Sequence, residues 1–237
     1  MSKYGRQRFK ITNHHSDIAH VVSLAHMYGV DVMAREIYLH EGASNSDEID
    51  CVMATGFIKN LNILNNLSSK PILIHQQTPG GSWSDGMAIF NALQQSSAAT
   101  VMIAYAHAKS MSSITLQAAD KRVLCRDTEF MVHHGSQCVD DRQEAFQSAA
   151  AQAELNMDRM LYIYASRCIQ GRHYRKRKSI TIDAVKKELD QKMRMRDDWW
   201  MMPDEAIDYG FADGVLGEKG FEDVDVIRKC KRRRCVA

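Results

Sequence analysis

Short apolar runs alternate with amphipathic stretches between residues 71 and 133, and this alternation limits what the chain can fold into. The apolar, β-branched runs are typical of buried strands, and the stretches between them are typical of helices. We expect strands at 71–75, 100–106, 122–125 and 129–133, and helices at about 83–93 and 110–119. Strands that alternate with helices imply crossover connections, so the sequence predicts an α/β fold.

The flanking regions extend this pattern. We expect a first helix at 16–28, a short strand at 35–40 and a helix at 46–65, and one long helical stretch at about 140–167. That last stretch is more than twice the ~11–12-residue mean length of a helix, and such helices often project from a body to meet another subunit. Three prolines are too few for a Pro-rich linker, which favours one continuous domain.

Composition excludes several classes of protein. The chain is 45% apolar and 25% charged, which is typical of globular proteins and not of disordered or fibrous ones. No stretch approaches the ~18 consecutive apolar residues of a membrane span, and the first residues lack the apolar segment of a signal peptide. We therefore expect a cytoplasmic protein, in which the six scattered cysteines remain thiols.

The near-neutral net charge of +2 hides two basic runs. Residues 172–178 carry five positive charges and residues 228–234 carry six, with no acid in either run. The rest of the chain then has 20 basic against 29 acidic residues, so an acidic body carries two basic segments. The second run favours a solvated tail over a nucleic-acid contact, because no aromatic residues are interleaved with the charges. Contact with the acidic bodies of neighbouring subunits is a further alternative.

Four features could carry chemistry. Gly80-Gly81 follows a predicted strand, where it is either a tight turn or a loop that exposes N–H groups to a ligand. Ser110 lies between a strand and a helix, as an N-cap or as a presented hydroxyl. His133 ends a strand, with His134 as a competitor. A pair of acids, Asp197 and Asp198, comes later in the chain.

The sequence blocks that contain these residues resemble those of a known family. The blocks Thr-Pro-Gly-Gly-Ser at 78–82, Ala-His-Ala-Lys-Ser-Met at 106–111, Phe-Met-Val-His at 130–133 and the segment 198–213 are similar to those of the Clp protease proteolytic subunit. The resemblance covers about 36–217. It implies a crotonase-like superhelix of ββα units, with the helix from about Asp140 as a protruding handle. Residues 1–35 then form a divergent N-terminal segment, about 171–182 a basic insertion, and 218–237 a basic C-terminal tail.

The resemblance also implies an activity, that of a serine endopeptidase. Ser110 would be the nucleophile, His133 its general base and Asp198 the carboxylate that orients the imidazole, with Asp198 preferred over Asp197 because it aligns without a gap. The backbone N–H groups of Gly81 and Met111 would form the oxyanion hole. The residue types fit, because a serine hydroxyl needs a neighbouring imidazole to take its proton before it can attack an amide.

Partners follow from the same resemblance. The active form would be a heptameric ring, stacked in pairs as a tetradecamer, that degrades polypeptides delivered by an ATP-dependent AAA+ unfoldase chaperone. This subunit would need no metal or organic cofactor, and no membrane or nucleic-acid partner is expected. Two alternatives remain open: a catalytically silent ring subunit, suggested by Lys109 beside Ser110 and by a short 110–133 interval, and an acyl-CoA enzyme of the wider crotonase superfamily.

Overall fold

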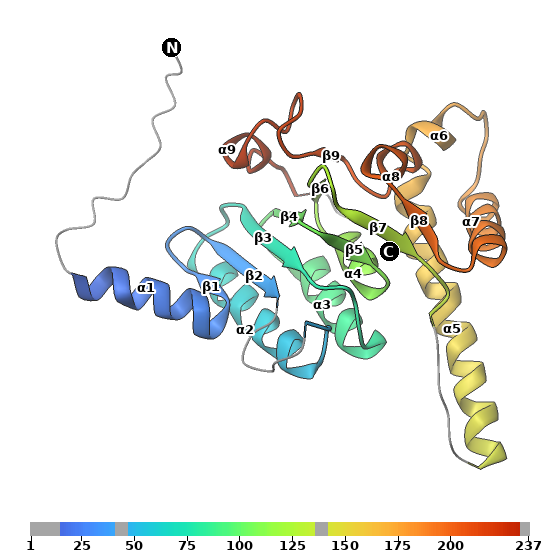
Figure 1. Cartoon of the computed structure of the whole chain (residues 1–237), viewed down its shortest axis with the longest axis horizontal. Helices are drawn as coiled ribbons and strands as arrows, with labels where there is room; N and C mark the ends of the chain where they lie inside the picture. The colour runs from blue at the N-terminus through green and yellow to red at the C-terminus, as the bar shows by residue number, and fades with distance from the viewer. Residues whose placement is uncertain (1–14, 41–46, 136–141, 233–237) are drawn as a thin grey trace.

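The computed structural model describes residues 15–40, 47–135 and 142–232, and Figure 1 shows its arrangement. In these residues the strands are β1 (Val30–Asp31), β2 (Glu36–His40), β3 (Ile72–Gln77), β4 (Thr100–Ala104), β5 (His107–Lys109), β6 (Lys121–Leu124), β7 (Glu129–Val132), β8 (Trp199–Met201) and β9 (Gly214–Val215). The helices are α1 (His15–Tyr28), α2 (Cys51–Leu67), α3 (Trp83–Gln95), α4 (Met111–Leu116), α5 (Gln143–Cys168), α6 (Arg172–Arg175), α7 (Ile182–Arg196), α8 (Pro203–Tyr209) and α9 (Val224–Ile227).

The main sheet has the strand order β1-β2-β3-β4-β6-β9 and is parallel except for the β1–β2 pair. Its alternate side chains enter two separate cores, as the twofold period of a strand requires. Ile72, Ile74 and Met102 belong to the larger core, which includes the apolar faces of α2 and α3. Leu73 and Ile103 belong to a smaller core on the opposite face. Both faces of the central strands are therefore covered, which explains their continuous apolar runs.

The smaller core is closed by the segment that follows β9. Ile227 of α9 is fully buried against Leu73, Val101, Ile103 and Val123. Figure 1 shows this red segment returning to the main sheet far from the long helix α5. The chain thus completes its sheet with residues that come late in the sequence.

Two arginines hold this segment in place, which corrects the expectation of a solvated tail for the part of the basic run that the structure describes. Arg228 donates to Ala34 O at 2.7 Å and pairs with Glu36. Arg232 donates to Asp120 Oδ2 at 2.9 Å and to Gln94 O at 2.6 Å. The Asp120 carboxylate is only 1% exposed, so Arg232 neutralises a buried charge. Residues 233 and 234 of the run lie outside the described residues.

The predicted strand at 100–106 is wrong in one respect. The chain leaves the main sheet at Ala104 and begins a second sheet at His107, with the order β5-β7-β8. β5 is parallel to β7, with Lys109 opposite Met131, and β8 is antiparallel to β7, with Trp199 opposite Val132. This register places three residues at one edge of the small sheet. They are Ser110, which follows β5, His133, which follows β7, and Asp198, which precedes β8.

Helix α5 extends away from the body in Figure 1, as the sequence predicts for a long helix. The start predicted near Asp140 lies outside the described residues. The first half of α5 is exposed, whereas Met160, Tyr164 and Cys168 in its second half are buried. The basic insertion that follows is packed and not loose, because Tyr174 of α6 is fully buried and Arg177 pairs with Glu188 of α7 at 2.6 Å.

Candidate active site

Ser110 lies between β5 and α4 with an unusual backbone. Its φ is +52° and its ψ is −131°, in a region that non-glycine residues rarely adopt at a cost of ~1–3 kcal/mol. It occupies the N-cap position of α4, but its side chain makes no capping hydrogen bond. The hydroxyl instead lies 2.8 Å from His133 Nε2. The side chain is thus aimed at an imidazole and is not used to cap the helix.

His133 joins this serine to an acid. Its Nδ1 lies 3.2 Å from Asp198 Oδ1, and its Nε2 faces Ser110. An imidazole with its proton on Nδ1, facing the carboxylate, would leave Nε2 as an acceptor for the hydroxyl of Ser110. A hydrogen bond between Ser110 and His133 and a close polar contact between His133 and Asp198 connect the three side chains. These are the three residues at the common edge of the small sheet.

The structure also separates the two neighbouring acids. Asp197 adopts φ +59° where the chain turns out of α7, and this turn brings Asp198 beside the imidazole. His134, the competitor of His133, lies 2.9 Å from Asp190 of α7. Nothing in the sequence distinguishes Asp190 from the many other charged residues of its helix.

Gly81, on the other candidate loop, has a backbone conformation that requires glycine. Its φ is +145°, and a Cβ there would lie 2.5 Å from Ile49 O. A short bridge to Ile49 uses the carbonyl of Gly80 and the N–H of Ser82. Adjacent peptide groups of an extended chain point in opposite directions, so the Gly81 N–H is directed away from Ile49. Gly81 and Met111 line the same cavity as Ser110 and His133.

That cavity has a volume of about 680 Å³. Besides the polar groups, its walls carry apolar side chains from three helices: Trp83 from α3, Ile114 from α4, and Met157 and Met160 from α5. The sequence analysis placed Ser110 and His133 together but did not predict these walls, because their residues read simply as the buried faces of helices.

Lys109, the cation next to Ser110, does not enter this cavity. Its Nζ lies 3.1 Å from Glu129 Oε2 and 5.5 Å from the centre of the Trp200 ring. Lys109 and Glu129 are on the neighbouring strands β5 and β7 of the small sheet. Because successive residues of a strand point to opposite faces, the Lys109 side chain is directed away from the side of its neighbour, Ser110. The hydrogen bond from Lys109 also lowers the pKa of Glu129 from its usual range.

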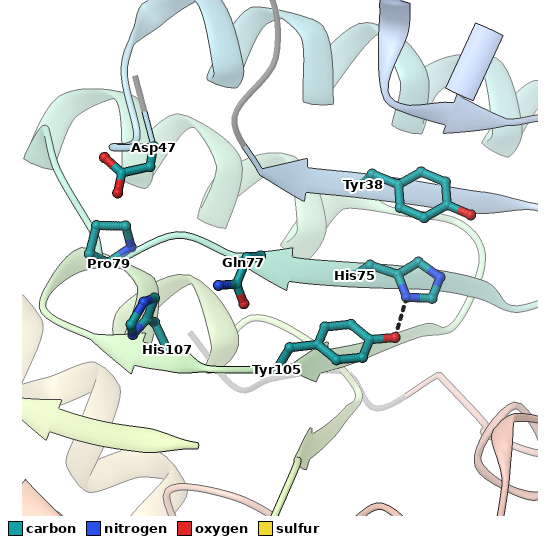
Figure 2. A pocket seen from close by; sticks show the side chains of 7 residues that line it. All are labelled: Tyr38, Asp47, His75, Gln77, Pro79, Tyr105 and His107. Atoms are coloured by element: carbon teal, nitrogen blue, oxygen red, sulfur yellow. Dashed lines mark hydrogen bonds between the residues drawn. The ribbon is translucent and has the colours of Figure 1, made fainter. Parts of the chain in front are cut away.

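A second cavity, of about 670 Å³, lies at the carboxyl ends of β2 and β3 (Figure 2). The rings of Tyr38, His75 and Tyr105 stack there, with centroids 4.7 and 5.8 Å apart. Tyr105 Oη and His75 Nδ1 share a hydrogen bond of 2.8 Å, and His75 Nε2 faces Glu36 at 3.1 Å. Burial opposes ionisation of Glu36, but the hydrogen bond and charge of His75 and the charge of Arg228 outweigh it and lower the pKa of Glu36. Nothing in the sequence pattern pointed to this cavity.

No helix in residues 15–40, 47–135 and 142–232 is long and apolar enough to cross a membrane. Within the same residues, no group of three or more His, Cys, Asp or Glu side chains is arranged to hold a metal ion.

A parallel α/β core in which a histidine lies between a serine and an aspartate, in contact with both, has the arrangement found in serine hydrolases. The chain belongs to the Clp protease family, whose model matches residues 28–219. The Clp protease proteolytic subunit 3 of Parasynechococcus marenigrum is 29% identical over 63% of this chain and 68% of its own length. The proteolytic subunit of Deinococcus radiodurans is 25% identical over 72% of this chain and 77% of its own length.

A solved structure agrees with this assignment. A ClpP1 mutant from Listeria monocytogenes superimposes with a TM-score of 0.64 and covers 83% of this chain and 96% of its own. At 19% identity, this likeness bears on the fold. It confirms the prediction of a ClpP-type fold, and the chain is a divergent, ClpP-like member of the Clp protease family.

Proposed function

We propose that this chain is an active serine endopeptidase. The observation that carries the proposal is the line of contacts from Ser110 Oγ to His133 Nε2, at 2.8 Å, and from His133 Nδ1 to Asp198 Oδ1, at 3.2 Å. The family supports the reaction, and the relatives named above are proteolytic subunits. The apolar walls around Ser110 suit an extended polypeptide with large side chains.

Each of these residues has a separate role in the proposed reaction. Ser110 Oγ attacks the scissile carbonyl while His133 Nε2 takes the hydroxyl proton. The N–H groups of Gly81 and Met111 stabilise the oxyanion of the tetrahedral intermediate. His133 then returns the proton to the leaving amine, and the acyl group remains on Ser110. Water, deprotonated by His133, attacks the acyl carbonyl, and His133 then returns this proton to Ser110 Oγ as the carboxylic acid leaves. Asp198 stabilises the imidazolium that forms twice in each cycle.

We further propose that the subunit works in the cytoplasm inside a chamber of stacked heptameric rings. Relatives bear the name of an ATP-dependent protease subunit, which implies a separate AAA+ unfoldase as the partner that uses ATP. Helix α5 supports the contact between rings, because it extends from the body and exposes Phe146 and Leu155, at 57% and 65%. Exposed large apolar side chains on a projecting helix favour burial against a second subunit.

The main alternative, a silent ring subunit, loses part of its basis. The sequence suggested it because a cation stands beside Ser110, and Lys109 is directed to Glu129 and Trp200 instead of the cavity. No observation in the structure favours an acyl-CoA enzyme over a peptidase.

The proposal is tested by covalent labelling with a fluorophosphonate probe. Such a probe reacts with a serine only where a base activates the hydroxyl. We expect the assembled wild-type protein to be labelled, and peptide mapping to place the label on Ser110. An assembled protein that is not labelled would favour the silent subunit.

Gly81→Ala tests the oxyanion hole. The methyl group would meet the Ile49 carbonyl at 2.5 Å and displace the Gly81 N–H. We expect kcat for a fluorogenic peptide to fall by ~10²–10³-fold, the usual cost of losing one oxyanion donor. Gly56→Ala is the control, because a Cβ there meets nothing within 4 Å. Equal rates for both variants would remove Gly81 from the mechanism.

A further inference from the structure

Two consecutive histidines, His133 and His134, each contact a carboxylate that lies on helix α7 or just after it. His133 contacts Asp198 at 3.2 Å, and His134 contacts Asp190 at 2.9 Å. Asp190 lies on α7, and Asp198 lies two residues beyond the end of that helix at Arg196. The end of β7 is therefore joined to the C-terminal part of α7 and the turn after it by two neighbouring contacts. Only the contact between His133 and Asp198 belongs to the proposed catalytic residues.

The contact to Asp198 is weakly restrained by itself. The Asp198 side chain is 47% exposed, and a half-exposed pair at 3.2 Å gains little from electrostatics alone. Asp198 also follows a left-handed residue, Asp197, in the short turn between α7 and β8. Its position relative to His133 depends on how firmly α7 is held against the end of β7.

Asp190 is suited to that restraint. One of its oxygens faces His134, and the other accepts from Arg194 Nε at 3.0 Å, one helical turn away. Its helix is fixed from the other side by Val185, Leu189 and Met193, which are buried in the larger core. His134 is thus tied to a rigid element and not to a loose surface side chain.

We propose that His134 and Asp190 are a pair of positioning residues that hold Asp198 in contact with His133. The inference rests on the proposed peptidase function. The pair acts on the contacts between Ser110, His133 and Asp198 through the backbone of residues 133–134 and through α7. A displacement of about 1 Å in such a line of contacts can cost ~10²-fold in rate, so the restraint is large enough to matter.

The chain offers a matched control for this pair. His173 Nε2 lies 3.3 Å from Glu188 Oε1, which is also on α7, and the side chains in both pairs are about one quarter exposed. His134 lines the cavity of Ser110, whereas His173 and Glu188 do not, so KM is measured beside kcat to detect a lost substrate contact. Loss of either histidine removes one contact to α7, but only loss of His134 frees the segment beside His133.

The experiment compares His134→Ala, His134→Gln and His173→Ala by kcat and KM for a fluorogenic peptide. We expect His134→Ala to lower kcat by ~10–100-fold with KM nearly unchanged. Gln keeps a donor for Asp190, so His134→Gln should recover most of the rate. His173→Ala should leave kcat unchanged. Equal losses in His134→Ala and His173→Ala would overturn the inference, because the effect would then be general loosening of α7.

A second measurement separates positioning from mere stability. If His134 acts through Asp198, His134→Ala should have no further effect on kcat in an Asp198→Asn background. Independent, multiplicative losses would overturn the inference and leave the proposed function intact. A wild-type protein that is not labelled at Ser110 would overturn both, so the two failures are distinguishable.

Discussion

Replacing Ser110 by Ala is expected to abolish peptide hydrolysis, with a fall in kcat on the order of 10⁶-fold. The substitution removes the one oxygen that lies 2.8 Å from His133 Nε2 and leaves the imidazole without a nucleophile to activate. Alanine and serine suffer similar strain at φ +52°, so the variant should fold and assemble like the wild type. The measurement is the initial rate of cleavage of a fluorogenic peptide, alongside a melting curve and the assembly size.

The adjacent aspartates provide a matched control for the rest of the line. Asp198→Asn should lower kcat by ~10⁴-fold, because an amide favours the wrong tautomer of the imidazole. Asp197→Asn should have little effect, since Asn tolerates the left-handed conformation that Asp197 adopts. Comparable losses in the two variants would contradict the assignment of Asp198, and hydrolysis by Ser110→Ala would contradict that of Ser110.

Replacing Arg232 by Ala is expected to lower the free energy of unfolding by about 2–3 kcal/mol. Breaking a buried ion pair costs ~3–5 kcal/mol, and the value here is smaller because the Arg232 side chain is 23% exposed. The substitution leaves Asp120 buried with the N–H and hydroxyl of Thr100 as remaining donors. It also removes the donor to Gln94 O at the end of α3. The measurement is the urea midpoint, compared at constant m-value.

Lys231→Ala is the control for this prediction. Lys231 is exposed and belongs to the same basic run, so its loss should change the free energy of unfolding by no more than ~0.5 kcal/mol. If the two variants were equally stable, Arg232 would contribute no more than a solvated charge, and the packed arrangement of this segment would be contradicted.

Much of the fold could be predicted from local pattern. The strands predicted at 71–75 and 100–106 overlap β3 and β4, whose side chains are buried on both faces of the central sheet. Ser110 stood out because it lies between a strand and a helix, and His133 because it ends a predicted strand. The second sheet escaped prediction, because 100–106 reads as one β-branched, apolar run and only tertiary pairing of 107–109 with 129–131 shows where the second sheet begins.

Other features depend on contacts between distant parts of the chain. Arg232 and Asp120 are 112 residues apart, and a basic run gives no sign of which charge will meet a buried carboxylate. Asp190 and His134 are 56 residues apart, and each has many charged or polar neighbours in sequence. Local periodicity contains no information on such pairs, whereas the family resemblance could single out Asp198, which lies 3.2 Å from His133, because its surrounding block is distinctive.

The late segment that covers the main sheet sets an order of events during synthesis. Residues 224–232 leave the ribosome after every strand that they cover, and after Ser110, His133 and Asp198. Until then, the face that carries Leu73 and Ile103 has no apolar cover from this segment. The sheet can be covered by this segment only when translation has passed residues 28–219, the region that matches the Clp protease family. A growing chain therefore carries all three residues of its proposed catalytic line before its fold is finished.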